Sequence, residues 1–241
     1  MQAKKRFYKD VTSNVTADGW SIKLDSRALR SPAGTPLLLP TAGLADAVAG
    51  EWAAQIDTID PASMPLFSLS VTVVDRVVPQ QGAVVAELAG YGGNDLLCYR
   101  DDNDDLARRQ QQTWQPWLDW AEAHFGARLN VAVGIMPVAQ PDAPRFHDHL
   151  HGLDAWRLAV LHRAVSLGGS LVLGLGFLMA KLDSEQLFET AFLDELWQNE
   201  KWGSDYEAQD RRDYIRAELQ DAARFLALLP QPASQPRGHQ P

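Results

Sequence analysis

Residues 192–207 read FLDELWQNEKWGSDYE and join two helical patterns across a glycine. The first pattern begins near Asp183, whose side chain can cap a helix while Gln186 reaches back as the other half of a capping box. Gly203 suits the left-handed backbone position that follows a last helical turn. Residues 204–207, SDYE, have the spacing of a second capping box that opens a final helix. The stretch therefore predicts two helices joined by a tight turn.

The helical period, continued through this stretch at about 100° per residue, places an apolar arc along one side. Glu195 and Trp202 fall in the middle of that arc, while Asp194, Glu200 and Asp205 lie nearer its edges. A carboxylate among apolar neighbours costs roughly several kcal/mol of desolvation unless it is paired. Two alternatives follow for Glu195: an arginine or amide within the fold satisfies it, or it is held for an external donor.

Composition and charge narrow the class of protein. The chain has 241 residues, 46% of them hydrophobic, and eight tryptophans, which is typical of a globular protein with one large or two modest domains. Its net charge of −9 disfavours nucleic acid as a partner, because phosphate contacts need a basic surface. A partner with a basic or mixed surface fits this charge better.

Cysteine usage and the first residues bear on the compartment. The single cysteine, Cys98, excludes an internal disulfide and a zinc site built on several thiolates, and its apolar neighbours favour a buried packing thiol. Residues 1–8 lack an apolar signal core and are too short for a transit peptide, so we expect a cytoplasmic protein.

Residues 1–80 predict a small α+β N-terminal domain. Apolar runs at 7–15 and 20–24 flank a turn at Asp18-Gly19 and predict a hairpin, with a further short strand at 27–30. After a proline-rich turn, Thr41 caps a helix whose inner face carries Leu44, Val48 and Trp52. The density of β-branched residues at 66–78 slightly favours a strand, and a helix is nearly as plausible.

Residues 81–229 predict a mainly α-helical C-terminal domain. The acidic run 101–105 is read as the solvated N-terminus of a helix that continues to Phe125, with an interruption near Pro116. Residues 129–133 are read as a strand or extended arm, so that the segment 128–136 returns to the N-terminal domain.

The most apolar region, 164–180, approaches the roughly 17–25 residues of a membrane span. Small and polar interruptions and amphipathic neighbours instead favour a central helix buried on all sides, and we expect no stable membrane insertion. The last helix, from Asp205 to about 229, has an inner face of Tyr214, Ile215, Leu219, Ala222 and Leu226. The Pro/Gln-rich tail 230–241 is expected to be disordered.

Enzymatic chemistry has one candidate arrangement. His147 and His151 are four residues apart and share a helical face, as metal-ligand pairs do, but no third ligand is evident. A carboxylate- or metal-assisted hydrolase would combine these histidines with Asp194 and Glu195. No nucleophile elbow or dinucleotide fingerprint is present, and a binding protein fits the aromatic residues and embedded carboxylates at least as well.

Several motifs together resemble one family, the assembly chaperones for the α subunit of F-type ATP synthase, which includes mitochondrial ATP synthase assembly factor 2 and its bacterial relatives. The resemblance covers nearly all of residues 5–228. The motifs are RFYK at 6–9, LDSR at 24–27, PAGTPL at 32–37, AVAGEW at 47–52, DPASMPL at 60–66, DLLCYR at 95–100, WLDW at 117–120 and DELWQNEKWGSD at 194–205.

The resemblance implies a small α+β domain followed by a helical domain, and a chaperone that binds free α subunit until it pairs with β. The lack of a transit peptide suits a bacterial member of the family. The resemblance also implies no nucleotide hydrolysis, and we expect no catalytic residue, cofactor or metal, and a monomer. The key acidic position of the family falls on Glu195, and the tryptophan of its N-terminal Glu-Trp pair falls on Trp52. The predicted partner-binding residues are Glu195, Asp194, Trp202, Asp205 and Trp52.

Overall fold

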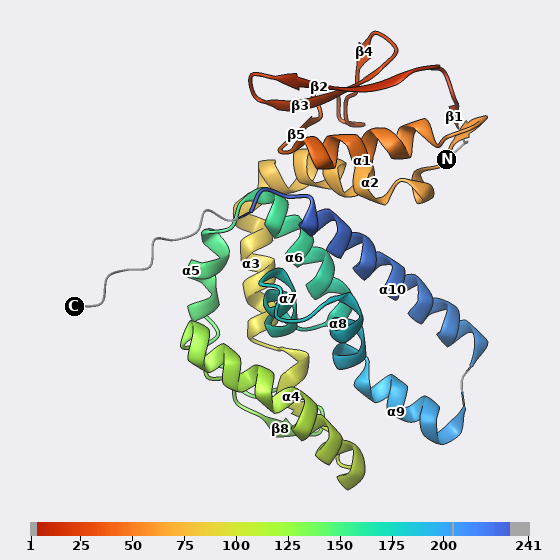
Figure 1. Ribbon diagram of the computed structural model, residues 1–241. Helices are drawn as coiled ribbons and strands as arrows, with labels where there is room; N and C mark the ends of the chain where they lie inside the picture. The colour runs from red at the N-terminus through yellow and green to blue at the C-terminus, as the bar shows by residue number, and fades with distance from the viewer. Residues whose placement is uncertain (1–3, 204, 232–241) are drawn as a thin grey trace.

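The computed structural model describes residues 4–203 and 205–231, and Figure 1 shows a sheet at one end of the molecule and helices throughout the other. Strands β2 (Val11–Thr16) and β3 (Gly19–Leu24) pair antiparallel, with Val11 opposite Leu24. The short strands β4 (Arg27–Ala28) and β5 (Leu38–Leu39) pair with the other edge of β3. The predicted hairpin and the further short strand are confirmed.

Helices α1 (Ala42–Ala53) and α2 (Pro65–Thr72) lie between this sheet and the remaining helices (Figure 1). Thr41 caps α1 as expected, since its hydroxyl accepts a hydrogen bond from the backbone N–H of Leu44 at 3.1 Å. The preference for a strand at 66–78 is wrong. The chain there continues from α2 through a π-helical turn, Val73–Val77, and a 3₁₀ turn, Val78–Gln80.

A buried carboxylate explains why this apolar segment is helical. Glu51 on α1 accepts hydrogen bonds from the backbone N–H groups of Leu66 and Phe67 at 2.9 and 2.8 Å. The first turn of a helix has N–H groups without intrahelical acceptors and favours negative charge. Glu51, on the neighbouring helix α1, supplies both the hydrogen-bond acceptors and the negative charge. The periodicity of residues 66–78 could not predict this contact, because Glu51 lies outside that segment.

A two-stranded ribbon forms a separate edge of the N-terminal part. Strands β1 (Lys4–Lys5) and β6 (Thr58–Ile59) pair antiparallel, followed by a 3₁₀ turn at Pro61–Ser63. Arg6 holds the ribbon to the chain around it by donating to the backbone carbonyls of Gln55, Tyr8 and Lys9.

The rest of the described chain is mainly helical, which confirms the predicted fold class. Its helices are α3 (Gln81–Gly92), α4 (Asp104–Phe125), α5 (Arg145–His151), α6 (Ala155–Gly168), α7 (Leu171–Leu178), α8 (Ser184–Ala191), α9 (Leu193–Trp202) and α10 (Tyr206–Ala227), with a 3₁₀ turn at Leu96–Cys98.

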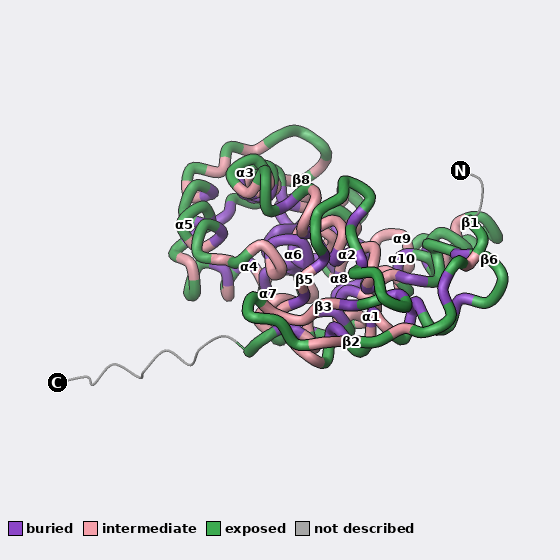
Figure 2. The backbone as a smooth tube through the Cα atoms, turned by 90° about the horizontal axis from the view of Figure 1, so that it is seen from above, coloured by how far each residue is buried: buried purple, intermediate pink, exposed green. Residues whose placement is uncertain are grey.

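The apolar region 164–180 is central and buried, as Figure 2 shows for α6, but it is two helices rather than one. Gly169 takes a left-handed conformation (φ +70°) that ends α6, and the Ser170 side chain caps α7. A Cβ at Gly174 would lie 2.5 Å from Val165 Cγ2, so this glycine permits the close approach of α7 to α6. Within the described residues, no helix has the length and apolarity needed to span a membrane.

Two further expectations are corrected. Helix α4 runs without interruption through Pro116. Proline removes one helical hydrogen bond, but Pro116 and the residue four positions earlier, Gln112, are exposed, so water can satisfy the freed carbonyl.

Strand β8 (Ala132–Val133) pairs in parallel with β7 (Tyr99–Arg100), inside the helical part, so the segment 128–136 does not join the N-terminal sheet.

The buried apolar residues form one continuous cluster from Tyr8 to Leu229. Thr41 links the two ends of the chain because its hydroxyl, besides capping α1, donates to the carbonyl of Leu228 at 2.6 Å. A domain boundary near residue 80 therefore stays a prediction. The expectations for Ser204 as a helix cap and for residues 232–241 lie outside the described residues.

Candidate functional site

The predicted helix through residues 183–203 is two helices, α8 and α9. Its start is confirmed: Asp183 and Gln186 form both hydrogen bonds of a capping box, each at 2.9 Å. Phe192 leaves the helical conformation (φ −100°, ψ 19°) and separates α8 from α9. The break changes the direction of every later side chain. Trp202 is therefore 74% exposed, and its expected position in an apolar arc is wrong.

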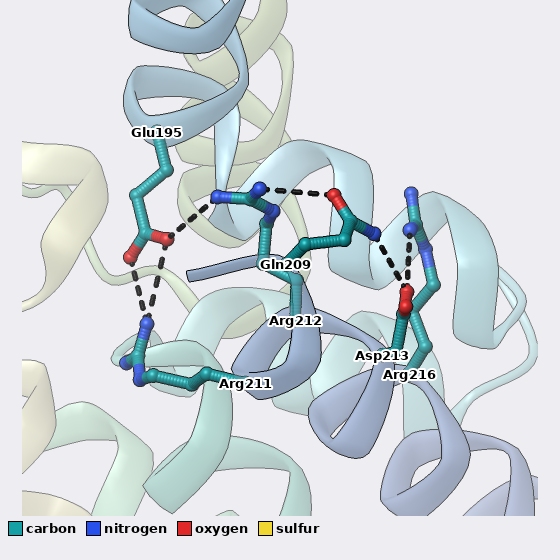
Figure 3. Close-up of polar contacts among 6 residues, drawn as sticks. All are labelled: Glu195, Gln209, Arg211, Arg212, Asp213 and Arg216. Atoms are coloured by element: carbon teal, nitrogen blue, oxygen red, sulfur yellow. Dashed lines mark hydrogen bonds and ion pairs between the residues drawn. The ribbon is translucent and has the colours of Figure 1, made fainter. Parts of the chain in front are cut away.

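Glu195 faces helix α10. Its Oε1 and Oε2 accept hydrogen bonds from Arg211 Nη1 at 3.0 and 3.4 Å, and Oε2 lies 4.0 Å from Arg212 Nη1 (Figure 3). The Glu195 side chain nevertheless remains 40% exposed. Glu195 therefore pairs with an arginine within the fold, which was the first alternative. It is also accessible from solvent, as the second alternative, an external donor, requires.

Arg212 is a buried cation that sequence reasoning missed. Its side chain is 2% exposed, and its Nη2 donates to Gln209 Oε1 at 3.0 Å (Figure 3). With the Asn199 amide oriented so that its oxygen faces the guanidinium, that oxygen accepts from both terminal nitrogens at 2.9 and 3.0 Å. The sequence did contain a signal for this burial. Arg212 lies on the same helical face as Ile215, Leu219 and Ala222, which follow it at spacings of three, four and three along the buried face of α10. By contrast, Tyr214, expected on that face, is exposed.

Polar contacts also hold α9 to α4. Arg109 and Glu200 form a bidentate ion pair with N–O distances of 2.6 and 2.8 Å, and this pairing lowers the pKa of Glu200. Asp194 accepts a hydrogen bond from Gln110 Nε2 at 2.9 Å. Its partial burial raises its pKa above the ordinary aspartate value. Helices α4, α8, α9 and α10 enclose a cleft of about 650 Å³ between them.

The connection from α9 to α10 presents large aromatic side chains. Trp202 packs edge to face on the buried Trp197, with centroids 5.6 Å apart, and Tyr206 is 78% exposed. Gly203 has the predicted positive φ, +86°, and the exposed Asp205 directly precedes α10. Glu195 and Trp202 are seven residues apart on α9 and so lie on nearly the same side of it.

Trp52 lies elsewhere, in the N-terminal part. Its ring packs edge to face between Tyr8 and Phe67, at centroid distances of 5.6 and 5.0 Å, and it is 6% exposed. Its carbonyl accepts a hydrogen bond from the Tyr8 hydroxyl at 2.7 Å. The indole N–H is buried and has no acceptor in the described part of the chain. Four of the five predicted residues are therefore on or beside α9, and Trp52 is not.

The arrangement for a hydrolase is not assembled. His147 and His151 do share a face of α5, with their Nε2 atoms 3.2 Å apart. In Figure 1, however, α5 and α9 lie on opposite sides of the helical part, so the histidines are remote from Glu195. In the described ranges, no three His, Cys, Asp or Glu side chains are grouped to hold a metal ion. Cys98 is buried, which raises the pKa of its thiol to about 12.

Comparison with known proteins relates these features to one family. A family model described as ATP12 chaperone protein matches residues 5–122. The chain is 38% identical to Atp12 from Paracoccus denitrificans, whose crystal structure superposes with a TM-score of 0.89 over 94% of this chain and 99% of that one. It is 25% identical to the mitochondrial protein atp12 of Schizosaccharomyces pombe, over 93% of this chain and 81% of that protein. It is 24% identical to mitochondrial ATP12 of Saccharomyces cerevisiae, over 92% of this chain and 83% of that protein.

Proposed function

This chain belongs to the ATP12 chaperone family, and on that basis we propose that it binds the free α subunit of F-type ATP synthase until that subunit pairs with β, without hydrolysing nucleotide. An unassembled subunit exposes an apolar interface that would otherwise aggregate. A chaperone for it needs an accessible contact surface whose affinity is moderate, so that β can take its place.

The surface that we assign to this role is the outer side of α9 and its connection to α10, and the observation that carries the assignment is the half-exposed pairing of Glu195 with Arg211. Exposed aromatic residues, Trp202 and Tyr206, lie at the end of the same helix and the start of the next. Exposed apolar groups rimmed by charges are typical of interaction sites.

The exposure of this ion pair makes exchange of partners inexpensive. A solvent-exposed pair contributes about 0.2–1 kcal/mol, whereas breaking a buried pair costs about 3–5 kcal/mol. Glu195 can therefore turn from Arg211 to a cationic side chain or backbone N–H of the client at little cost. When β supplies the client with its own contacts, Glu195 returns to Arg211, which favours release.

Light scattering tests this proposal. Denatured α subunit diluted into buffer should aggregate less when this chain is present in equimolar amount. Glu195→Gln keeps the shape and removes the charge, so it should remain folded and protect less well. Glu122→Gln, which neutralises an exposed carboxylate on α4, is the matched control and should protect like the wild type. Full protection by Glu195→Gln would reject the assigned surface, and no protection by the wild type would reject the function.

A further inference from the structure

The N-terminal part carries a second open surface. A groove of about 1340 Å³ lies between the turn around β4 and the ribbon of β1 and β6, and we call it the β4 groove. Its volume exceeds the roughly 300–1,000 Å³ of most small-molecule pockets, so it suits a larger occupant. Figure 1 places β4 and β1 at the opposite end of the molecule from α9, so the groove is separate from the surface assigned above.

Part of the lining of the β4 groove is apolar and aromatic. Trp52 and Phe67 both contribute to it, as do Leu24, Leu29 and Ile59. Phe7 also lines the groove and is 50% exposed. Aromatic side chains in such a position are typical contact points for apolar side chains of a protein partner.

The cations and the carboxylates of the groove differ in the partners that they have among the described residues. Lys4, Arg27 and Arg30 line it, and within residues 4–203 and 205–231 no carboxylate forms an ion pair with any of them. The Arg30 side chain donates to the carbonyl of Gly34, and the Arg27 side chain has no hydrogen bond in the same ranges. The groove therefore offers three cations that have no anionic partner among the described residues.

The carboxylates of the groove, by contrast, already have donors. Asp25 accepts hydrogen bonds from the backbone N–H groups of Lys9 and Asp10 at 3.0 and 2.9 Å, which lowers its pKa. Asp60 accepts from the backbone N–H of Ala62 at 3.1 Å.

The first 39 residues carry seven Lys or Arg against three Asp, although the whole chain has a net charge of −9. An acidic segment is thus attracted to this end and repelled by the rest.

We infer that the β4 groove binds an extended polypeptide segment that carries both apolar and acidic side chains. The apolar side chains fill the space beside Trp52 and Phe67, and the carboxylates pair with Lys4, Arg27 and Arg30. This inference deepens the proposed function and rests on it in one respect, namely that the segment belongs to the same client. Contacts at two ends of the chaperone raise affinity for a large client without any single tight site.

Fluorescence anisotropy with two labelled short peptides tests the inference on the full chain. One peptide alternates leucine with glutamate, and the other alternates leucine with lysine. The acidic peptide should bind roughly tenfold more tightly at low ionic strength, and the difference should shrink as salt screens the charges. Arg27→Glu should weaken binding of the acidic peptide by roughly tenfold. Lys23→Glu, which reverses an exposed charge on β3 outside the groove, should leave it unchanged.

Equal affinity for the two peptides, or equal losses in the two variants, would overturn the inference. The light-scattering assay separates it from the proposed function. Peptide binding without protection of α subunit would keep the groove and reject the client. Protection of α subunit by a wild-type chain that binds neither peptide would reject the groove and keep the function.

Discussion

Glu195 on α9 and Arg211 on α10 are sixteen residues apart, and their side chains meet with Oε1 and Nη1 at 3.0 Å (Figure 3). Both remain open to solvent, at 40% and 59% exposure, while the adjacent Arg212 is 2% exposed. Two neighbouring arginines therefore approach one carboxylate under different dielectric conditions, and their contributions to stability should differ.

Arg212→Ala is expected to lower the free energy of unfolding by about 2–4 kcal/mol, because it leaves the acceptors on Gln209 and Asn199 without this donor, and a buried acceptor without a donor costs about 1–3 kcal/mol. Arg211→Ala should cost less than about 1 kcal/mol. Urea titrations followed by circular dichroism measure both. Similar losses in the two variants would show that the difference in burial does not govern this pair.

Asp95 should give the protein a pH-dependent stability. It is fully buried and accepts hydrogen bonds from the backbone N–H groups of Leu97 and Val172 at 3.0 and 3.1 Å. Burial raises its pKa from 3.8 to about 6. Between these values the folded state keeps a proton that the unfolded state releases. The contribution of Asp95 to the free energy of unfolding is therefore fully present below pH 3.8 and is lost as the pH rises through about 6.

The size of this effect follows from the pKa shift and is about 3 kcal/mol. Asp95→Asn removes the titration, so the difference in unfolding free energy between wild type and variant should fall by about that amount from about pH 4 to about pH 7. Denaturation series at several pH values measure it. A difference that stays constant across this range would mean that Asp95 titrates normally.

Gly174→Ala should destabilise the fold by about 1–3 kcal/mol, because the new Cβ would lie 2.5 Å from Val165 Cγ2 and 3.0 Å from Leu161 Cδ1. Gly90→Ala on α3 is the control, since nothing lies within 4 Å of its added Cβ, and it should be neutral or stabilising by up to about 1 kcal/mol. Thermal melting compares the two. A melting temperature for Gly174→Ala equal to that of the wild type would refute the close contact.

Trp52→Ala should cost about 3–5 kcal/mol, because it removes the ring packed between Tyr8 and Phe67. Trp52→Phe keeps an aromatic ring and removes an N–H that has no acceptor in the described residues, so it should cost less than about 1.5 kcal/mol. The same urea titrations apply. Unchanged stability of Trp52→Ala would show that Trp52 is a surface contact and not a core residue.

The ends of several helices could be predicted from the sequence because their signals are local. Thr41 and Asp183 each satisfy backbone N–H groups within three residues of themselves, and both caps are present in the structure. The β2–β3 hairpin is likewise determined by neighbouring residues and its turn. For such features, the sequence contains the donor, the acceptor and the spacing.

The features that could not be predicted depend on partners distant in the chain. Phe192 breaks a helical pattern although neither glycine nor proline marks the place, and its ring stacks on Phe188 with centroids 4.7 Å apart. That break turned Trp202 outward and invalidated the face assigned to it. The helical state of 66–78 depends on Glu51. Glu195 could be identified as a candidate, but its partner Arg211 could not, because the two residues lie on different helices and no local spacing relates them.

The most direct test of the proposed function is co-purification with the α subunit. A tagged form of this chain, expressed together with α, should recover α in equimolar amount, and adding excess purified β should release it. Glu195→Gln should lower the recovery without lowering the yield of folded chaperone. Failure of the folded wild-type chain to recover α, or retention of α in the presence of excess β, would contradict the account.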